Sequence, residues 1–570
     1  MTRGTLVPVA AIAAIAAVSA VLVMRPSGQS PPRRIVRGIV PVEATIEPLA
    51  QPTRGGNAVL RVRYAEGVRL PVRVPYATEY GTVVLADDGQ GFDARAGDGL
   101  YTALGTMDLA ATRARLLELS RSDTAMPTRT WRDRSKTSLG VRIDPRRFRV
   151  GERFPFEPWG NPAAISASDS LLIRHLGVVE DAGRTSAACG QPSMGVWSFG
   201  YLMEQMANTP VTGVTGSQFV RAWLDRWMTA QPVNGFNVGP RTMMQAEILD
   251  PWIAASGGSG APLDLSKAPF RLLAIVNRLD LRDQVAYGGT SGGELRFVFM
   301  YIPPDCGGNG QPFEVILEYG LPVSGCLNLK ALAMQWKALE ALGAGSAAYN
   351  AALEAITQQV VVANAGVGKP NGSALNQVRT NENLLDNTGE GLDWQVREFR
   401  IDPATHLLAQ DTDAQTPQRF LRFDAKVPNY VNGHTASIKA GTHVVPLTYP
   451  TAADPFRGGG LIYGLGTFWN NAGGVSIPDR EARHKFSLNT CDGCHTGETH
   501  NFFTHVGAES FGTPASLSGF MTGAWVDDPA DQAPVRFFDE LERRAVDLDA
   551  LLNTSCLAIS LDQPLFAISH

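Results

Sequence analysis

The sequence predicts a multidomain protein in which an N-terminal all-β domain precedes an α+β body with a mostly helical C-terminal segment. Three observations lead to this class. At about 150 residues per domain, a chain of 570 residues has room for two to four domains. Short alternating apolar and polar runs fill residues 41–145, as half-buried strands require. Long apolar runs and helical periodicity follow from about residue 165 onward.

Composition and charge narrow the range of functions. Hydrophobic residues make up 44% of the chain and charged residues 18%, which is typical of a folded protein. The formal net charge is −5, so the chain lacks the basic footprint of a nucleic-acid-binding protein. We therefore expect no nucleic-acid partner.

The N-terminus indicates export. Residues 5–24 form an uncharged apolar run, long for a signal peptide and just long enough to span a bilayer. Val18-Ser19-Ala20 offers a small-residue cleavage site, so a signal peptide and a membrane tether remain alternatives for residues 1–24. Residues 25–40 are a Pro-rich linker. The residues after about 30 are expected in the periplasm, cell envelope or extracellular space, with anchoring to the inner membrane as one option.

Residues 41–145 are expected to form a β domain. Val59–Tyr64 and residues 70–74 alternate in polarity, and the loop Asp87–Tyr101 carries Asp-Gly pairs. This loop resembles the "DDG…GD…AGDGxY" segment of immunoglobulin-like modules in secreted bacterial proteins, which implies a β-sandwich with a spacer or adhesive role. The aspartates between Asp87 and Asp98 could hold calcium. The spacing differs from an EF-hand, and tight turns are the favoured interpretation.

The body is expected to span residues 165–480 and to contain an antiparallel sheet. Apolar runs at 270–276, 295–302 and 313–319 predict strands buried on both faces, and their short connections favour antiparallel neighbours. Trp394–Ile401 is a further strand. Helices are expected at 217–227, capped by Ser217, and at 327–342 and 346–361.

The C-terminal segment, residues 481–570, contains the most specific motif. Cys491-Asp-Gly-Cys494-His495 has the spacing of a c-type haem attachment site, in which two thiols bond the haem vinyl groups and the histidine becomes an axial ligand. Chance would produce this spacing roughly once in a thousand such chains. A helix from Pro534 to Asn553 is expected to cover the segment.

Three interpretations of the motif compete. In the first, Cys491 and Cys494 carry haem c, His495 is the axial ligand, and the sixth ligand comes from His505, His500, His484 or Met521. In the second, Cys491, Cys494, His500 and His505 form a zinc site. In the third, Cys491 and Cys494 form a tight disulfide. Export favours haem over zinc, because zinc needs reduced thiolates.

The other four cysteines are expected to form disulfides. Cys306 and Cys326 flank one predicted strand and lie close in sequence, which favours the pairs Cys306–Cys326 and Cys189–Cys556.

A serine nucleophile has little support. Gly289-Thr-Ser291-Gly-Gly293 matches G-x-S-x-G, but that motif needs a strand, a sharp turn and a helix. Here strand-like residues follow the glycines.

Several segments together resemble a group of uncharacterised secreted bacterial proteins with a C-terminal CxxCH motif. The matching segments are 270–280, 314–322, 372–382, the motif stretch and 517–523. The resemblance implies one unit from about 165 to 555 and brings no known activity. In that group the position of Met521 is often another apolar residue, which favours His505 as the sixth ligand.

These observations predict an exported c-type haem protein for envelope electron transfer or small-molecule redox chemistry. Its expected partners are a redox protein or a small molecule. The alternative is a non-enzymatic envelope or surface protein whose Cys/His cluster is a structural disulfide or zinc site. No catalytic residue is assigned.

Overall fold

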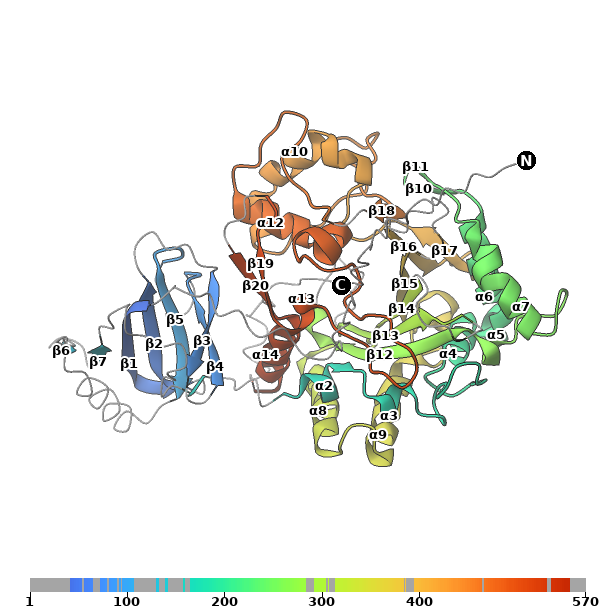
Figure 1. The fold of residues 1–570 in the computed structure, drawn as a ribbon, viewed down its shortest axis with the longest axis horizontal. Helices are drawn as coiled ribbons and strands as arrows, with labels where there is room; N and C mark the ends of the chain where they lie inside the picture. The colour runs from blue at the N-terminus through green and yellow to red at the C-terminus, as the bar shows by residue number, and fades with distance from the viewer. Residues whose placement is uncertain are drawn as a thin grey trace, which may run out of the picture.

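The computed structural model describes most of the chain after residue 40 (Figure 1). The described residues are 41–53, 56–64, 72–78, 81–89, 92–93, 95–106, 130–132, 139–141, 157–158, 165–282, 292–303, 306, 313–383, 385, 394–463, 466–530 and 535–553. The apolar run 5–24 and Ser291 lie outside them. No helix within the described ranges is long and apolar enough to cross a membrane.

The N-terminal region is a single hydrogen-bonded sheet in its described residues. Its strands follow the order β3-β4-β5-β2-β1-β7-β6, with β8 paired to β5, and every pair is antiparallel. An immunoglobulin-like sandwich needs two packed sheets, so this finer expectation is not established. The strands are β1 (Pro41–Thr53), β2 (Gly56–Tyr64), β3 (Arg73–Thr78), β4 (Gly81–Ala86), β5 (Leu100–Thr106), β6 (Thr130–Arg132), β7 (Leu139–Val141) and β8 (Glu157–Pro158).

The body is built on a second antiparallel sheet, as expected. Its order is β17-β16-β15-β14-β13-β12-β9, with β18 paired to β16. Three strands match the predicted apolar runs, and β15 is an addition that the sequence did not suggest. The strands are β9 (Leu172–Ile173), β12 (Phe270–Arg278), β13 (Glu294–Tyr301), β14 (Phe313–Gly320), β15 (Leu375–Glu382), β16 (Trp394–Ile401), β17 (Leu408–Asp411) and β18 (Leu461–Tyr463).

Helices surround this sheet and make the fold mixed α+β. Helix α6 begins after Thr215, whose hydroxyl and Gln218 form a capping box, so the expected cap at Ser217 was two residues late. The described helices are α2 (Ala167–Ser170), α3 (Leu176–Val179), α4 (Phe199–Ala207), α5 (Thr209–Thr212), α6 (Gly216–Asp225), α7 (Asp250–Ala255), α8 (Cys326–Ala338), α9 (Ala347–Val361), α10 (Lys426–Gly433), α11 (Thr435–Lys439), α12 (Arg480–Leu488), α13 (Gly519–Thr522) and α14 (Glu540–Asn553).

One face of the body sheet forms the main aromatic core. Phe270, Phe299 and Phe313 point to this face, where the ring of Phe199 from α4 stacks on Phe270 with centroids 4.2 Å apart. Trp223 from α6 lies 6.5 Å from Phe313 by centroid distance. These contacts bury the odd-numbered positions of β13 completely or nearly so.

The opposite face of the sheet is covered by the C-terminal segment, drawn in red in Figure 1 with α13 and α14 beside β12–β14. The expected helix from Pro534 is partly wrong. Residues 535–538 form β20 (Val535–Phe538), which pairs with β19 (Ala524–Asp527), and the helix begins only at Glu540. Strand pairing of Arg536 with Val526 overrides the helical pattern there.

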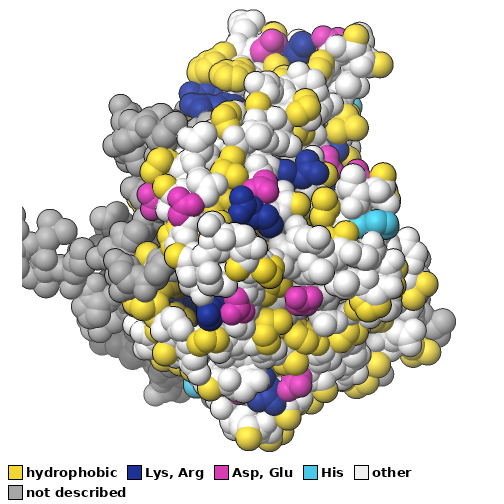
Figure 2. All heavy atoms as spheres, turned by 90° about the vertical axis from the view of Figure 1, so that its right-hand side faces the viewer, with side chains coloured by type: hydrophobic (Ala, Val, Ile, Leu, Met, Phe, Trp, Pro, Cys, Tyr) yellow, Lys and Arg dark blue, Asp and Glu magenta, His cyan; other side chains and the backbone are white. Residues whose placement is uncertain are grey.

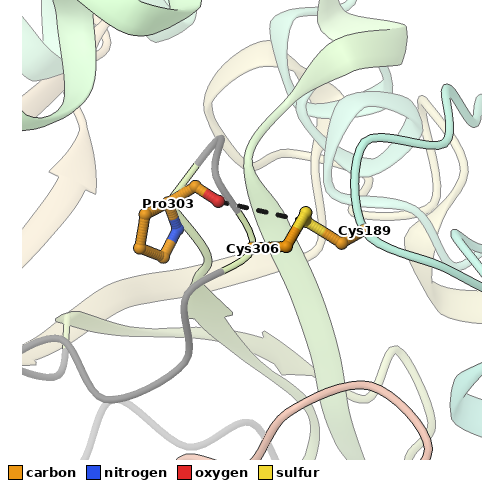
Figure 3. Close-up of a disulfide and its surroundings, with 3 residues drawn as sticks. All are labelled: Cys189, Pro303 and Cys306. Atoms are coloured by element: carbon orange, nitrogen blue, oxygen red, sulfur yellow. Dashed lines mark hydrogen bonds between the residues drawn. A yellow bond between two sulfur atoms is a disulfide. The ribbon is translucent and has the colours of Figure 1, made fainter.

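The disulfide pairing expected from sequence spacing is wrong. Cys189 is bonded to Cys306, and its sulfur lies 3.9 Å from the Pro303 carbonyl oxygen (Figure 3). The pairs Cys306–Cys326 and Cys189–Cys556 are therefore excluded, because the loop that carries Cys189 folds against the end of β13. Cys326 is disulfide-bonded as well, and Cys556 lies outside the described residues.

The surface carries charges of both signs. On the face shown in Figure 2, lysine and arginine side chains are interspersed with aspartate and glutamate, and apolar side chains are scattered between them. This face therefore presents no large area of a single charge among the residues drawn in colour.

Candidate functional site

The CxxCH motif lies in a helical turn that follows α12. Residues Gly493–Gly497 form a π-helical turn, a local geometry that is frequent at functional sites. Both glycines are needed for close packing. A Cβ atom on Gly493 would collide with the Ser487 carbonyl oxygen, and one on Gly497 with the Thr467 carbonyl oxygen. The turn therefore presses the motif into the protein interior.

Both motif cysteines are thiols in the protein interior. Neither Cys491 nor Cys494 forms a disulfide, and each is 0% exposed. Cys491 packs in a small cluster with Trp394, Val396 and Phe503, where the two aromatic rings stack 4.4 Å apart. Burial raises the pKa of both thiols, so they are protonated at neutral pH. The structure thus gives no support to a Cys491–Cys494 disulfide.

His495 is held as a neutral imidazole of defined tautomer. Its Nδ1 lies 2.7 Å from the Phe503 carbonyl oxygen, which only accepts hydrogen bonds, so Nδ1 carries the proton. Burial lowers the pKa of His495 to about 4. Nε2 therefore carries a lone pair, as it does in a metal-ligating histidine whose other nitrogen is fixed by a carbonyl group.

His505 lies next to two residues of the motif, His495 and Cys494. Its ring centroid is 4.6 Å from that of His495, and its Nε2 is 3.5 Å from the Cys494 sulfur. Its Nδ1 lies 3.0 Å from the Ser518 hydroxyl and 3.2 Å from the Asn501 amide nitrogen. The order of thiol, imidazole and polar partner resembles a nucleophile with its base. The buried, protonated thiol argues against that role.

The other sixth-ligand candidates have different surroundings. His500 is exposed, and His484 is bound through Nδ1 to Glu498 at 2.6 Å. Met521 is buried and lines a cavity together with His495 and His505. Of the four candidates, only His505 and Met521 therefore share a space with the expected axial ligand.

That cavity lies between the C-terminal segment and the polar face of the sheet. Its empty space, including any opening to solvent, is about 500 Å³. His495, His505 and Met521 form one wall, while Arg296, Glu314 and Arg379 belong to the wall made by the sheet. Neither motif thiol is among the lining residues.

The polar face of the sheet is a buried ionic network. Glu318 on β14 accepts ion pairs from Arg296 on β13 at 3.2 Å and from Arg379 on β15 at 3.3 Å. Arg379 also reaches Glu398 on β16 at 3.0 Å. Desolvating such charges is costly, and their attraction offsets that cost only with good geometry. The presence of this network is therefore not explained by a gain in stability alone.

A second network ties the motif to its surroundings. Arg483 on α12 donates to Glu498 and, at 2.9 Å, to both carboxylate oxygens of Asp528. His484, Glu498 and Asp528 have the mutual distances of a metal site. The arginine already satisfies the two carboxylates, so we interpret the cluster as an ion-pair staple.

The zinc alternative does not assemble. Within the described residues, two groups of potential ligands converge, and neither contains a motif cysteine. Cys491, Cys494, His500 and His505 are not brought together, since His500 is exposed and Cys491 packs in the apolar cluster.

The second converging group is Asp87, Asp93 and Asp98, the calcium alternative. Asp87 accepts hydrogen bonds from the backbone N–H groups of Gly97 and Gly99, and Asp93 from Gly89. These contacts are those of tight turns, as favoured from the sequence.

Sequence reasoning missed the sheet side of the site. The sequences of β13, β14 and β15 show apolar runs or no clear pattern. Their alternate positions nevertheless form a charged face, which carries Arg296, Glu314, Glu318 and Arg379. The signal was the spacing of Glu314 and Glu318, which puts both on one face of β14.

Comparisons with protein-family models, curated proteins and solved structures give no significant match to this chain.

Proposed function

We propose that this chain is an exported c-type haem protein in which Cys491 and Cys494 hold the ring and His495 is the axial ligand. The observation that carries the proposal is the state of His495. Its Nδ1 is bound to a backbone carbonyl at 2.7 Å, its Nε2 carries a lone pair, and two thiols outside any disulfide precede it at haem-attachment spacing.

The donor set suits haem c. Two thiols outside any disulfide and a neutral imidazole are the groups that covalent attachment and axial ligation require. Because both thiols are 0% exposed, attachment is expected before the C-terminal segment closes over the sheet. Bound haem would supply electron transfer or, with an open coordination position, chemistry on oxygen or peroxide.

Small-molecule redox chemistry is the favoured form of this function. Both nitrogens of His505 already have neighbours, Cys494 and Ser518, and His495 faces a cavity. An electron carrier has no need of such a cavity, whereas a redox site that handles a small molecule does. His505 and Met521 remain the candidate sixth ligands.

The N-terminal parts of the chain would export the protein and position the C-terminal site in the cell envelope. Residues 5–24 would direct export or tether the protein, and the N-terminal sheet would act as an immunoglobulin-like spacer. The likeness to secreted bacterial proteins with a CxxCH motif belongs to the same proposal.

A second candidate is a non-enzymatic envelope protein in which the motif is part of the core. The full burial of Cys491, Cys494 and His495 favours it, because such residues also occur as ordinary packing.

Export from a host with haem-attachment machinery, followed by denaturation and absorbance spectroscopy, separates the two candidates. The proposal predicts a covalent haem spectrum that Cys494→Ser abolishes. The matched control is the double variant Cys189→Ser/Cys306→Ser, which removes cysteines far from the motif and should keep the colour. A colourless wild-type protein of correct mass would favour the envelope protein.

A further inference from the structure

Glu314 has an environment unlike that of its neighbours on the polar face of the sheet. Its side chain is buried, and its Oε2 accepts a hydrogen bond of 2.6 Å from the Asn381 amide. In the described part of the chain, no lysine, arginine or histidine forms an ion pair with it. Glu318, four residues further along β14 on the same face, is held by two arginines.

A buried carboxyl group without a cation keeps its proton. Burial raises the pKa of Glu314 to about 8, and only the Asn381 hydrogen bond opposes this. At neutral pH the group is therefore a carboxylic acid, which can donate one hydrogen bond.

Asn381 supplies the complementary atom. Its Nδ2 is used by Glu314, while its Oδ1 is buried and has no hydrogen-bond partner. Unpaired buried acceptors are rare, because each costs the desolvation of the group. Glu314 and Asn381 both line the cavity that His495 lines, so a donor and an acceptor lie side by side on its wall.

The remaining lining favours an uncharged occupant. Val276, Val298, Ile316 and Met521 contribute apolar side chains to the cavity. Four arginines also line it, and each is paired: Arg296 and Arg379 with Glu318, Arg278 with Asp280, and Arg544 with Glu540. A charged ligand would have to compete with these ion pairs or lose its hydration without compensation.

We propose that this cavity binds a small uncharged molecule with an acceptor beside a donor, and that Glu314 and Asn381 are the groups that receive it. The choice of natural ligand class rests on the proposed function: it is a small hydroperoxide, which carries an acceptor and a donor on adjacent oxygens. Glu314 would donate to one oxygen, and the Asn381 carbonyl oxygen would accept from the terminal O–H.

The test uses the exported full-length protein and formamide, an unreactive probe with the same pairing of acceptor and donor. Infrared spectroscopy at neutral pH should show a protonated carboxyl band that Glu314→Gln removes and that formamide shifts. Calorimetry should show saturable binding that Glu314→Leu weakens about tenfold or more, the loss expected for one hydrogen bond. Glu314→Gln, which keeps a donor, should bind more tightly than Glu314→Leu.

The matched control is Glu382→Gln, the same change at a buried carboxyl of the same sheet that is paired with Arg241 on the other face. It should leave formamide binding unchanged. Equal binding by wild type and Glu314→Leu overturns the proposal. So does a carboxyl band that formamide leaves in place, since Glu314 and Asn381 would then be paired only with each other. Neither readout requires haem, so a colourless protein contradicts the proposed function without deciding this inference.

Discussion

The two faces of the body sheet differ in how they are buried. On one face, Phe299, Phe313 and Phe399 pack against Trp223 and Phe199, and the contacts are almost entirely aromatic. On the other, Arg296, Glu318 and Arg379 form a buried network under the C-terminal segment. Both faces are excluded from water to a similar degree.

The difference separates packing from function. Apolar burial stabilises a fold directly, whereas a buried ionic face gains little over apolar side chains of the same volume. We therefore propose that the ionic face, with a cavity and the CxxCH motif against it, serves the proposed site as well as the stability of the fold. We infer that the aromatic face holds the fold and that the ionic face holds the site.

The largest effect is expected from removing a cation of the ionic face while its carboxylate partners stay in place. Arg379→Met leaves Glu318 and Glu398 without a shared cation and should lower the free energy of unfolding by about 3–5 kcal/mol. Urea unfolding followed by tryptophan fluorescence measures the loss.

Replacing the whole group is the matched control for this prediction. Arg296→Met, Glu318→Leu and Arg379→Met, combined with Glu294→Gln and Glu398→Gln because these two carboxylates also pair with the replaced arginines, should recover most of the stability. If the combined variant is less stable than Arg379→Met alone, the distinction between the two faces fails.

Acid should destabilise the C-terminal segment itself by a somewhat smaller amount. Although burial opposes it, hydrogen bonds and charge from His484 and Arg483 lower the pKa of Glu498 to about 2. A lowered carboxyl pKa contributes stability that is complete above the unfolded pKa, about 4.5, and is lost as pH falls toward 2. The contribution is about 3 kcal/mol.

Urea unfolding at pH 6 and pH 3 checks this, with Glu498→Gln as comparison. The variant should be less stable at pH 6 and should lose less stability on acidification than the wild type. Parallel losses in the two proteins would show that Glu498 is not the acid-sensitive group.

The smallest changes in the free energy of unfolding are expected from apolar substitutions, and they should be larger in the packed core than beside the cavity. Phe313→Leu on the aromatic face should cost about 1–2 kcal/mol, because it leaves a gap between Trp223 and Trp227. Met521→Leu borders the cavity and conserves volume, so it should cost less than about 1 kcal/mol. Thermal unfolding of both variants measures the difference, and equal costs would contradict it.

Much of the fold could be predicted from the sequence. Strands β12, β13 and β14 match the predicted apolar runs, β16 matches the further predicted strand, and α9 matches the helix expected at 346–361. Strand β15 was missed because Leu375–Glu382 is largely polar, and its polar residues are buried only because partners on β14 and β16 satisfy them.

Other features depend on contacts between distant segments. The Cys189–Cys306 bond joins residues 117 positions apart, which spacing alone could not favour. The start of α14 depends on the pairing of β19 with β20. The motif was recognisable from sequence, but the Phe503 carbonyl that fixes His495 was not, because the turn between them sets that contact.

Peptide mass spectrometry of the motif shows directly whether haem is attached to Cys491 and Cys494. The protein would be exported from a host with haem-attachment machinery, digested, and the peptide that contains Cys491 and Cys494 isolated. We expect this peptide to carry the added mass of one haem and neither cysteine to react with an alkylating reagent. A peptide of unmodified mass, with both cysteines alkylated after denaturation, would contradict it.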